Sequence, residues 1–232
     1  MASRTLIGIY GGTFDPIHYG HLRVAEELAD NIGFDRFYFV PAGEPRLREV
    51  PAASKDQRCE MVRLAIADNP VFRLDEREIK RQGVSTTVES LQEYHAEFKG
   101  RATLCFVMGA DTFVKLHHWR HWHKLFELCH LIIVDRPGSL VMKDQQRLPE
   151  EIRQACVSRW VARSSDLTRC SSGMIYVAQT TLLDISATNI RALVAAGRSI
   201  RYLLHESVAD FIKTHHLYTG ANGFKNTGKN YS

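Results

Sequence analysis

The chain has 232 residues, of which 44% are hydrophobic and 24% are charged; this is the composition of an ordinary soluble globule with room for one sizeable domain. Its net charge of +4 and pI near 8.8 suit an enzyme that binds polyanionic substrates. The same charge is too mild to indicate a nucleic-acid-binding protein without a clustered basic face, and no apolar run approaches the roughly 20 residues of a membrane helix.

The five cysteines are scattered along the chain, and no two of them form a Cys-x-x-Cys pair. An odd number without such pairs favours reduced thiols over disulfides or zinc ligands. Residues 1–4 lead directly into the first predicted strand, so we expect no signal peptide. Together these features predict a cytoplasmic protein that binds neither nucleic acid nor a membrane, and they leave its oligomeric state open.

In chain order, the first half alternates strands and helices. Hydrophobic patterning predicts a strand at residues 6–10, a helix at 22–29, a strand at 36–40, a helix at 55–68 and a strand at 71–74. Ser54 suits the N-cap of the second helix, and Asn69-Pro70 ends it. A charged turn or strand edge is predicted at 76–81, and a third helix at 87–98.

The second half continues this alternation. Residues 102–108 carry the strongest central-strand pattern, and a helix at 119–129 and a strand at 130–134 follow. Residues 139–173 are polar and are predicted to be partly helical. A last strand at 174–178 and helices at 186–196 and 206–215 complete the predicted elements.

Strands that alternate with helices over the whole length predict an α/β fold. We expect a single Rossmann-like, doubly wound domain over residues 1–218, with a mostly parallel sheet and helices on both faces, and a disordered polar tail over 219–232. Ligands of such sheets bind beyond the carboxyl ends of the strands. The most informative segments fall at that edge: 11–21, 41–48, 109–111, Arg136 and 184–191.

The turn over residues 11–21 joins the first strand to the first helix. Paired glycines stand at the strand exit, and His18 and His21 lie three apart near the helix start, so they share a face. A helix start offers N–H groups and a positive dipole end, which suits an anion such as phosphate. The turn lacks both the Walker pattern and the G-x-G-x-x-G fingerprint. The plainer alternative is a tight turn whose histidines only cap a helix.

This turn, G-G-T-F-D-P-x-H-x-G-H-L, resembles the signature of the nucleotidyltransferase superfamily, and specifically of bacterial nicotinate-mononucleotide adenylyltransferases. Three later segments resemble that family in the same order. They are Gly109-Ala110-Asp111 with Trp119 beyond, Arg136-Pro137-Gly138, and the run from Ile185 to Arg191 that reads I-S-A-T-N-I-R. The resemblance spans nearly the whole chain.

The resemblance implies adenylyl transfer from ATP to nicotinate mononucleotide, which yields deamido-NAD and pyrophosphate in NAD biosynthesis. The attacking phosphate is largely dianionic at neutral pH because its second pKa is about 6, so no general base is required. Catalysis then rests on alignment and on donors to the phosphate oxygens, and His18 and His21 are the expected catalytic residues. Mg²⁺ is expected to arrive with ATP, with no fixed metal site on the protein.

The resemblance also assigns binding residues. Those expected on the ATP side are Gly11, Gly12, Thr13, Phe14, Gly109, Asp111, Ile185, Ser186, Thr188 and Arg191. Those expected on the mononucleotide side are Asp15, Thr87, Trp119 and Arg136. Ser186, Thr188 and Arg191 would form a second phosphate cradle at a helix start. Simpler roles remain open: Ser186 and Asp111 could be helix N-caps, and Trp119 a core residue.

Three departures from the family pattern fall on the mononucleotide side. Residues 44–48 read Glu-Pro-Arg-Leu-Arg where many members have Pro-Pro-His-Lys, so Arg46 or Arg48 could supply the positive charge. Residues 84–87 read V-S-T-T instead of P-S-Y-T, and Arg120 stands where an aromatic residue is common. A different mononucleotide substrate, either nicotinamide mononucleotide or phosphopantetheine, and a catalytically silent nucleotide-binding regulator stay open as alternatives.

Four histidines cluster next to Trp119: His117, His118, His121 and His123. On a continuous helix, His117 and His121 would be four apart and could hold a metal ion. No third ligand is near in sequence. A solvated or packed histidine face is the favoured interpretation.

Overall fold

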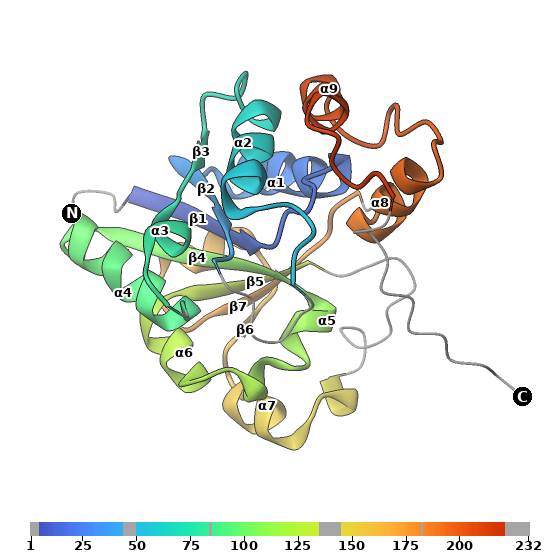
Figure 1. The fold of residues 1–232 in the computed structure, drawn as a ribbon. Coiled ribbons are helices and arrows are strands. Elements are labelled where there is room, and N and C mark those ends of the chain that lie inside the picture. Colours follow the sequence, from blue (N-terminus) through green and yellow to red (C-terminus); the bar gives the residue numbers. More distant parts are fainter. Residues whose placement is uncertain (1–4, 44–49, 84, 135–144, 182, 221–232) are drawn as a thin grey trace, which may run out of the picture.

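The computed structural model describes residues 5–43, 50–83, 85–134, 145–181 and 183–220. Within them, seven strands form one sheet in which every pairing is parallel, in the order β3-β2-β1-β4-β5-β7-β6 (Figure 1). The strands are β1 (Thr5–Gly12), β2 (Arg36–Pro41), β3 (Phe72–Leu74), β4 (Ala102–Gly109), β5 (His130–Val134), β6 (Trp160–Val161) and β7 (Ile175–Ala178). The predicted α/β class and parallel sheet are confirmed.

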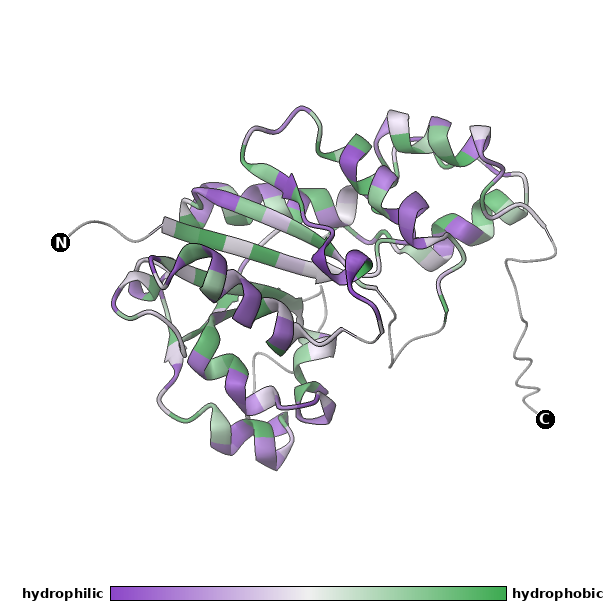
Figure 2. Cartoon of the chain, turned by 60° about the vertical axis from the view of Figure 1, so that its left-hand side comes forward, coloured by the Kyte–Doolittle hydropathy of each residue, from purple (hydrophilic) through white to green (hydrophobic). Residues whose placement is uncertain are grey.

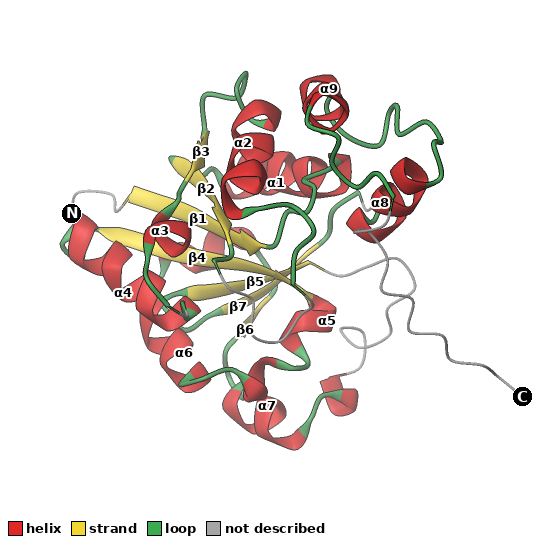
Figure 3. Ribbon diagram, in the orientation of Figure 1, coloured by secondary structure: helices red, strands yellow, loops and turns green. Residues whose placement is uncertain are grey.

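Helices connect the strands and cover both faces of the sheet (Figure 3). They are α1 (Tyr19–Ile32), α2 (Lys55–Ala65), α3 (Arg77–Lys80), α4 (Thr87–Phe98), α5 (Ala110–Phe113), α6 (Leu125–Leu128), α7 (Glu150–Ala155), α8 (Ala187–Ala195) and α9 (Glu206–Thr214). Short 3-10 turns lie at η1 (Leu116–His118), η2 (Trp122–Lys124), η3 (Gln145–Arg147) and η4 (Ser164–Thr168). None of the helices in the described ranges is long and apolar enough to cross a lipid bilayer.

The strand order reverses between β1 and β4. The chain runs outward from β1 to β2 and β3, and then returns to place β4 on the other side of β1. The connections after β1 and after β4 therefore leave the sheet in opposite directions, which opens a crevice at the carboxyl ends of these two strands. The segments that begin at Gly12 and Gly109 stand at this crevice.

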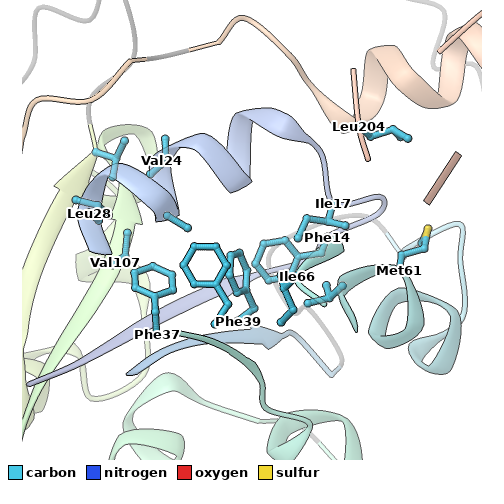
Figure 4. Packing of buried hydrophobic residues seen from close by; sticks show 14 of the residues in the cluster. Phe14, Ile17, Val24, Leu28, Phe37, Phe39, Met61, Ile66, Val107 and Leu204 are labelled. Atoms are coloured by element: carbon cyan, nitrogen blue, oxygen red, sulfur yellow. The ribbon is translucent and has the colours of Figure 1, made fainter. Parts of the chain in front are cut away.

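One face of the sheet packs against α1, α2, α8 and α9. Alternate strand residues such as Leu6, Val107 and Ile132 point to this side, where they meet Phe37 and Phe39. Figure 4 shows these two rings together with Phe14, Ile17, Val24, Leu28 and other apolar side chains of this cluster. Each fully buried side chain of this size contributes about 1.5–3 kcal/mol to folding.

The opposite face packs against α4, α5, α6 and α7. The strand residues next in line, such as Ile7, Phe106 and Ile133, point to this side, as the two-residue period of a strand requires. Figure 2 shows that the covering helices carry hydrophobic and hydrophilic residues together, as expected when one side of each helix faces a core.

Several helix starts follow directly from local sequence. Ser54 caps α2 by accepting from the backbone N–H of Gln57, and the Gln57 side chain accepts from Ser54 N–H in return. Thr86 and Glu89 form the same reciprocal pair at the start of α4. The predicted cap at Ser54 and the predicted helix at 87–98 are confirmed.

The structure corrects four of the predicted elements. Residues 119–129 are not one helix, because Trp119 is extended and His121 takes a left-handed conformation (φ 57°), so the chain forms η2 and the short α6. The charged segment 76–81 contains the short helix α3 instead of a strand edge. α2 ends at Ala65, three residues early. The polar region after residue 139 includes a strand, β6, that pairs with β7.

Candidate active site

His18 and His21 stand at the start of α1, where β1 enters the crevice. His18 is the N-cap residue and is 6% exposed, and His21 lies three residues on. Their rings lie nearly face to face, with centroids 3.8 Å apart and planes inclined by 30°. The His18 backbone N–H donates to His21 Nδ1 over 3.3 Å, which favours the tautomer whose proton is on Nε2 and can be donated. The predicted pairing of the two imidazoles is confirmed.

Phe14 anchors this turn in the core. Its ring is 2% exposed and meets the His21 ring edge to face, with centroids 5.1 Å apart (Figure 4 shows Phe14 among its apolar neighbours). Its φ of 50° is unusual for a residue with a side chain, and the packing holds it there. Any contribution of Phe14 to ATP binding therefore has to come from its backbone.

The first turn of α1 offers fewer open amides than expected from the sequence. Tyr19 N–H donates to the carbonyl of Leu203 over 3.0 Å, and His21 N–H donates to the carbonyl of His18 over 2.9 Å. The loop between α8 and α9 thus supplies an acceptor that the sequence pattern did not reveal. An anion at this turn would depend more on the imidazoles than on a row of free N–H groups.

The start of α8 lies against the start of α1. A Cβ added to Gly20 would stand 3.5 Å from the carbonyl oxygen of Ile185, an ordinary contact, but only 2.9 Å from His18 Nδ1, so glycine here leaves room for the His18 ring. Ser186 caps α8 by accepting from Asn189 N–H over 3.2 Å. The two predicted phosphate cradles are therefore neighbours, 165 or more residues apart along the chain.

Arg191 connects the two helix starts directly. One guanidinium nitrogen donates to the carbonyl of Asp15 over 2.7 Å, and the other lies 3.4 Å from Thr188 Oγ1. Thr188 is exposed, and the Arg191 side chain keeps 22% of its surface exposed, so both groups can reach a ligand in the crevice.

Asp15 is the centre of a buried hydrogen-bond network. Its carboxylate accepts from the backbone N–H groups of Ala52 (2.8 Å) and Ala53 (3.1 Å) and from the Tyr218 hydroxyl (2.7 Å). Burial, together with this nearby carboxylate, raises the pKa of Tyr218 well above its ordinary value. The carboxylate is thus occupied within the protein, and the predicted role of Asp15 in mononucleotide binding stays a prediction.

Arg58 is a residue of this region that sequence reasoning missed. It projects from α2, is 1% exposed, and donates to the carbonyls of Thr13 and Ala42 over 2.8 Å each and of Gly43 over 3.3 Å. Burial lowers the pKa of Arg58 from its ordinary value, while the Asp15 charge acts in the opposite direction. One signal was present: Arg58 stands one turn before Met61 and Val62, on the buried face of α2.

The opposite wall of the crevice begins at the end of β4. Gly109 is the N-cap of the short α5, and Asp111 lies exposed in its first turn. Trp119 follows η1, and its ring meets Phe106 of β4 edge to face at 6.2 Å. Trp119 is partly buried, so it serves the core on one side and is open on the other.

A third segment approaches from the end of β2. Gly43 packs so tightly that an added Cβ would stand 2.3 Å from the carbonyl oxygen of Glu78. Ser85, two residues before the start of α4 at Thr87, donates its hydroxyl to that same carbonyl over 3.3 Å. Burial raises the pKa of Glu78, whose carboxylate accepts from the Ser90 hydroxyl over 2.9 Å. This places Ser85, two residues before Thr87, close to the loop that ends β2.

Several predicted residues carry no structural account. Arg136, together with Arg46 and Arg48, lies outside the described residues. The histidines near Trp119 do not share a helix face, because the chain there forms two separate 3-10 turns. Within the described ranges, no group of three or more His, Cys, Asp or Glu residues could hold a metal ion.

The buried cysteines offer no reactive thiol. Four of the five are buried, and burial raises the pKa of Cys59 to about 11 and that of Cys156 to about 12. Such thiols stay protonated at neutral pH. The chemistry of the crevice therefore rests on imidazole, guanidinium, hydroxyl and backbone donors, which suit phosphate groups.

Comparison with known proteins agrees with this geometry. Residues 9–193 match the family model described as cytidylyltransferase-like. A protein of Halorhodospira halophila named probable nicotinate-nucleotide adenylyltransferase is 44% identical, over 87% of this chain and 90% of its own. Proteins with the same name are 42% identical in Dechloromonas aromatica, over 91% of this chain and 97% of the relative, and 39% identical in Yersinia pestis, over 94% and 98%.

Solved structures share the fold. The nicotinic acid mononucleotide adenylyltransferase of Plasmodium falciparum, complexed with APC, aligns with a TM-score of 0.67 at 20% identity and covers 92% of this chain and 97% of its own. The same enzyme complexed with NaAD aligns with a TM-score of 0.66 at 19% identity, with the same coverage. At these identities the likeness supports the Rossmann-like fold alone.

Proposed function

Because the chain belongs to the cytidylyltransferase-like family and, within it, to the nicotinate-nucleotide adenylyltransferases, we propose that it transfers the adenylyl group of ATP to nicotinate mononucleotide. The products are deamido-NAD and pyrophosphate, and the step belongs to NAD biosynthesis. The observation that carries this proposal is the contact between the starts of α1 and α8 at the carboxyl edge of the sheet.

In this reaction the 5′-phosphate of the mononucleotide attacks the α-phosphorus of ATP. A phosphorus–oxygen bond forms on one side while the bond to pyrophosphate breaks on the other, so no proton has to be removed from the nucleophile. His18 and His21 are suited to donate hydrogen bonds to the oxygens of the reacting phosphate, where negative charge grows in the transition state. Their stacked geometry allows both to address one anion.

We assign the β- and γ-phosphates to the start of α8. Ser186, Thr188 and Arg191 supply hydroxyls, backbone donors and a guanidinium in one turn, a combination that suits a polyphosphate. Arg191 already donates to the loop that leads to His18, so a phosphate bound there would lie beside the imidazoles.

The mononucleotide is assigned to the wall formed by β4 and α4. Trp119 offers an aromatic face for the pyridine ring, and Thr87 stands at the start of α4. Asp111, which we keep on the ATP side, is an exposed carboxylate on the same wall that suits the ribose hydroxyls of ATP. Arg136 completes the proposed set.

A cytoplasmic location and the absence of nucleic-acid partners remain predictions from composition.

Mg²⁺ enters this proposal with ATP. When bound, it would neutralise phosphate charge and favour departure of pyrophosphate. The donors around the crevice, which are mostly cationic or neutral, are suited to the phosphate oxygens that such an ion leaves free. The absence of a metal site on the protein itself remains a prediction.

A substrate comparison tests the proposed function. Pyrophosphate release from ATP would be measured at fixed Mg²⁺ with nicotinate mononucleotide, nicotinamide mononucleotide or phosphopantetheine as acceptor. The proposal predicts the highest kcat/KM for nicotinate mononucleotide. A preference for either other acceptor would reassign the substrate, and ATP binding without pyrophosphate release with all three would identify a nucleotide-binding regulator.

A further inference from the structure

Arg58 is buried where no substrate group reaches it, yet it touches two loops of the crevice. Its side chain is among the largest fully buried ones in the described part of the chain. Burying a charged group is costly unless hydrogen bonds replace its water, and here three backbone carbonyls do so. An apolar side chain of similar length would avoid that cost, so packing alone does not account for an arginine here.

The carbonyls belong to the two loops that would hold the two substrates. Thr13 lies in the turn between β1 and His18, and Ala42 and Gly43 lie in the loop after β2. A further bond, from Ala42 N–H to the carbonyl of Gly12 over 2.8 Å, ties these loops to each other. Arg58 thus joins the loop that follows β1 to the loop that follows the neighbouring strand β2, and it lies beneath both.

A peptide unit is planar, so fixing a carbonyl also fixes the N–H group of the next residue. The bond from Arg58 to Thr13 therefore sets the orientation of the peptide that leads into Phe14. The carbonyl of the Ala42–Gly43 peptide also accepts from Arg58, so this bond fixes the N–H group of Gly43 in the same way. The planar guanidinium, with its five donors, can serve several fixed acceptors at once, which a lysine ammonium cannot do in the same geometry.

We propose that Arg58 is a positioning residue for adenylyl transfer: it fixes the β1–α1 loop relative to the β2 loop and so aligns the two substrates. This inference rests on the proposed function. Loss of this alignment should lower kcat about 10- to 100-fold, because small misplacements of reacting groups have effects of this size.

Variants of two arginines on α2 test the proposal. Arg58→Met keeps the length and removes the donors, and Arg58→Lys keeps a charge but loses the fork. Arg63→Met is the matched control, because Arg63 is 53% exposed on the same helix and pairs only with Glu60 and Glu76 among its described ionic partners. Melting temperature, kcat and both KM values would be measured for each.

We expect Arg58→Met to lose kcat about 10- to 100-fold in the folded protein, and to melt at a lower temperature because three carbonyls lose their donor. Arg58→Lys should fall between that variant and the wild type, and Arg63→Met should match the wild type. A purely structural role predicts a lower melting temperature with normal kcat in the folded protein, and a wild-type kcat in Arg58→Met would overturn the proposal. If Arg58→Met does not fold, a wild-type kcat in Arg58→Lys would overturn the proposal instead.

Hydrogen exchange distinguishes failure of the positioning role from failure of the proposed function. Amides of residues 12–17 and 42–43 should exchange faster in Arg58→Met than in Arg63→Met, with other amides unchanged, whether or not any substrate is turned over. Unchanged exchange in both loops would overturn the positioning role. A wild-type chain that makes no dinucleotide, with faster loop exchange in Arg58→Met, would instead overturn the proposed function and leave the link between Arg58 and the loops established.

Discussion

The two walls of the crevice are built in different ways. The wall that carries His18 is tied down by contacts between distant parts of the chain: Asp15 meets Ala52 and Tyr218, and Arg191 meets Asp15. The wall beyond β4, by contrast, consists of a four-residue helix and two three-residue 3-10 turns, and Trp119 stands between those turns.

This difference in construction fits the different tasks that the proposed function gives to the two walls. Transfer between phosphates demands fixed donors, and a network that holds the loop from several sides can supply them. Recognition of a ring and a ribose can rely on a few side chains on short local turns, which can differ between relatives without disturbing the sheet. Of the departures from the family pattern, Arg120 lies on this second wall, directly after Trp119.

The largest effect should come from the histidines of the first wall. His18→Ala and His21→Ala should each lower kcat about 100-fold or more, because each removes a donor to the charge that grows in the transition state. Initial-rate kinetics with ATP and nicotinate mononucleotide measure this. The exposed His118 provides a control in His118→Ala, and near-normal turnover in the two site variants would remove the assigned role.

The next effect concerns the network around Asp15. Asp15→Asn puts an amide N–H₂ group against N–H donors, so the free energy of unfolding should fall by about 2–3 kcal/mol. Urea denaturation measures it, with Asp30→Asn on the exposed face of α1 as the control. A loss below about 0.5 kcal/mol would mean that the loop is held by other contacts.

On the second wall, we expect a change in substrate affinity instead of stability. Trp119→Ala should raise KM for the mononucleotide about tenfold and leave KM for ATP near its original value, since stacking of a ring on an aromatic side chain contributes about 1–3 kcal/mol. Trp119→Phe should retain much of the affinity. Equal increases in both KM values would argue that Trp119 only supports the core through Phe106.

The smallest effect lies away from both walls, at the amino end of β5. His130 is fully buried, Met174 N–H donates to its Nδ1, and its Nε2 lies 3.2 Å from the Cys170 carbonyl. Burial lowers the pKa of His130, so the unfolded chain takes up a proton first as the pH falls. Stability is then complete above about pH 6.5 and declines below it by at most about 1.4 kcal/mol per pH unit.

Unfolding measured between pH 5 and pH 8 checks this slope. His130→Asn should flatten the decline, whatever its effect on stability at pH 8, and His118→Asn should keep it. The wild-type kcat could also fall together with stability as the pH falls, while kcat of His130→Asn does not. Protonation of His130 would then affect the crevice, and His130 would not be independent of its two walls.

The sequence predicted the parts of the fold that depend on residues close to one another along the chain. Helix α4 has the predicted bounds because Thr86 caps its start and the chain turns left-handed at Lys99. The predicted helix at 119–129 was wrong, because the extended backbone at Trp119 and the left-handed backbone at His121 interrupt it. Local patterns cannot report a backbone angle that tertiary contacts impose.

The same limit applies to the site. His18, His21, Ser186 and Arg191 could be predicted as site residues because they stand in short motifs. Arg58 could not, because its partners lie up to 45 residues away, and Tyr218 could not, because Asp15 is 203 residues away. When a residue bonds a carbonyl or carboxylate far away along the chain, the sequence around that residue does not reveal the contact.

The bond between Tyr218 and Asp15 also bears on how the protein is made. Asp15 belongs to a segment that is synthesised early, yet one of its hydrogen-bond donors is added after 203 further residues. Contacts of such sequence separation form late, since their loop must close first. The nascent chain can therefore build most of its sheet before the loop that carries Asp15 is fully secured, and a chain interrupted before residue 218 would lack the Tyr218 donor to that carboxylate.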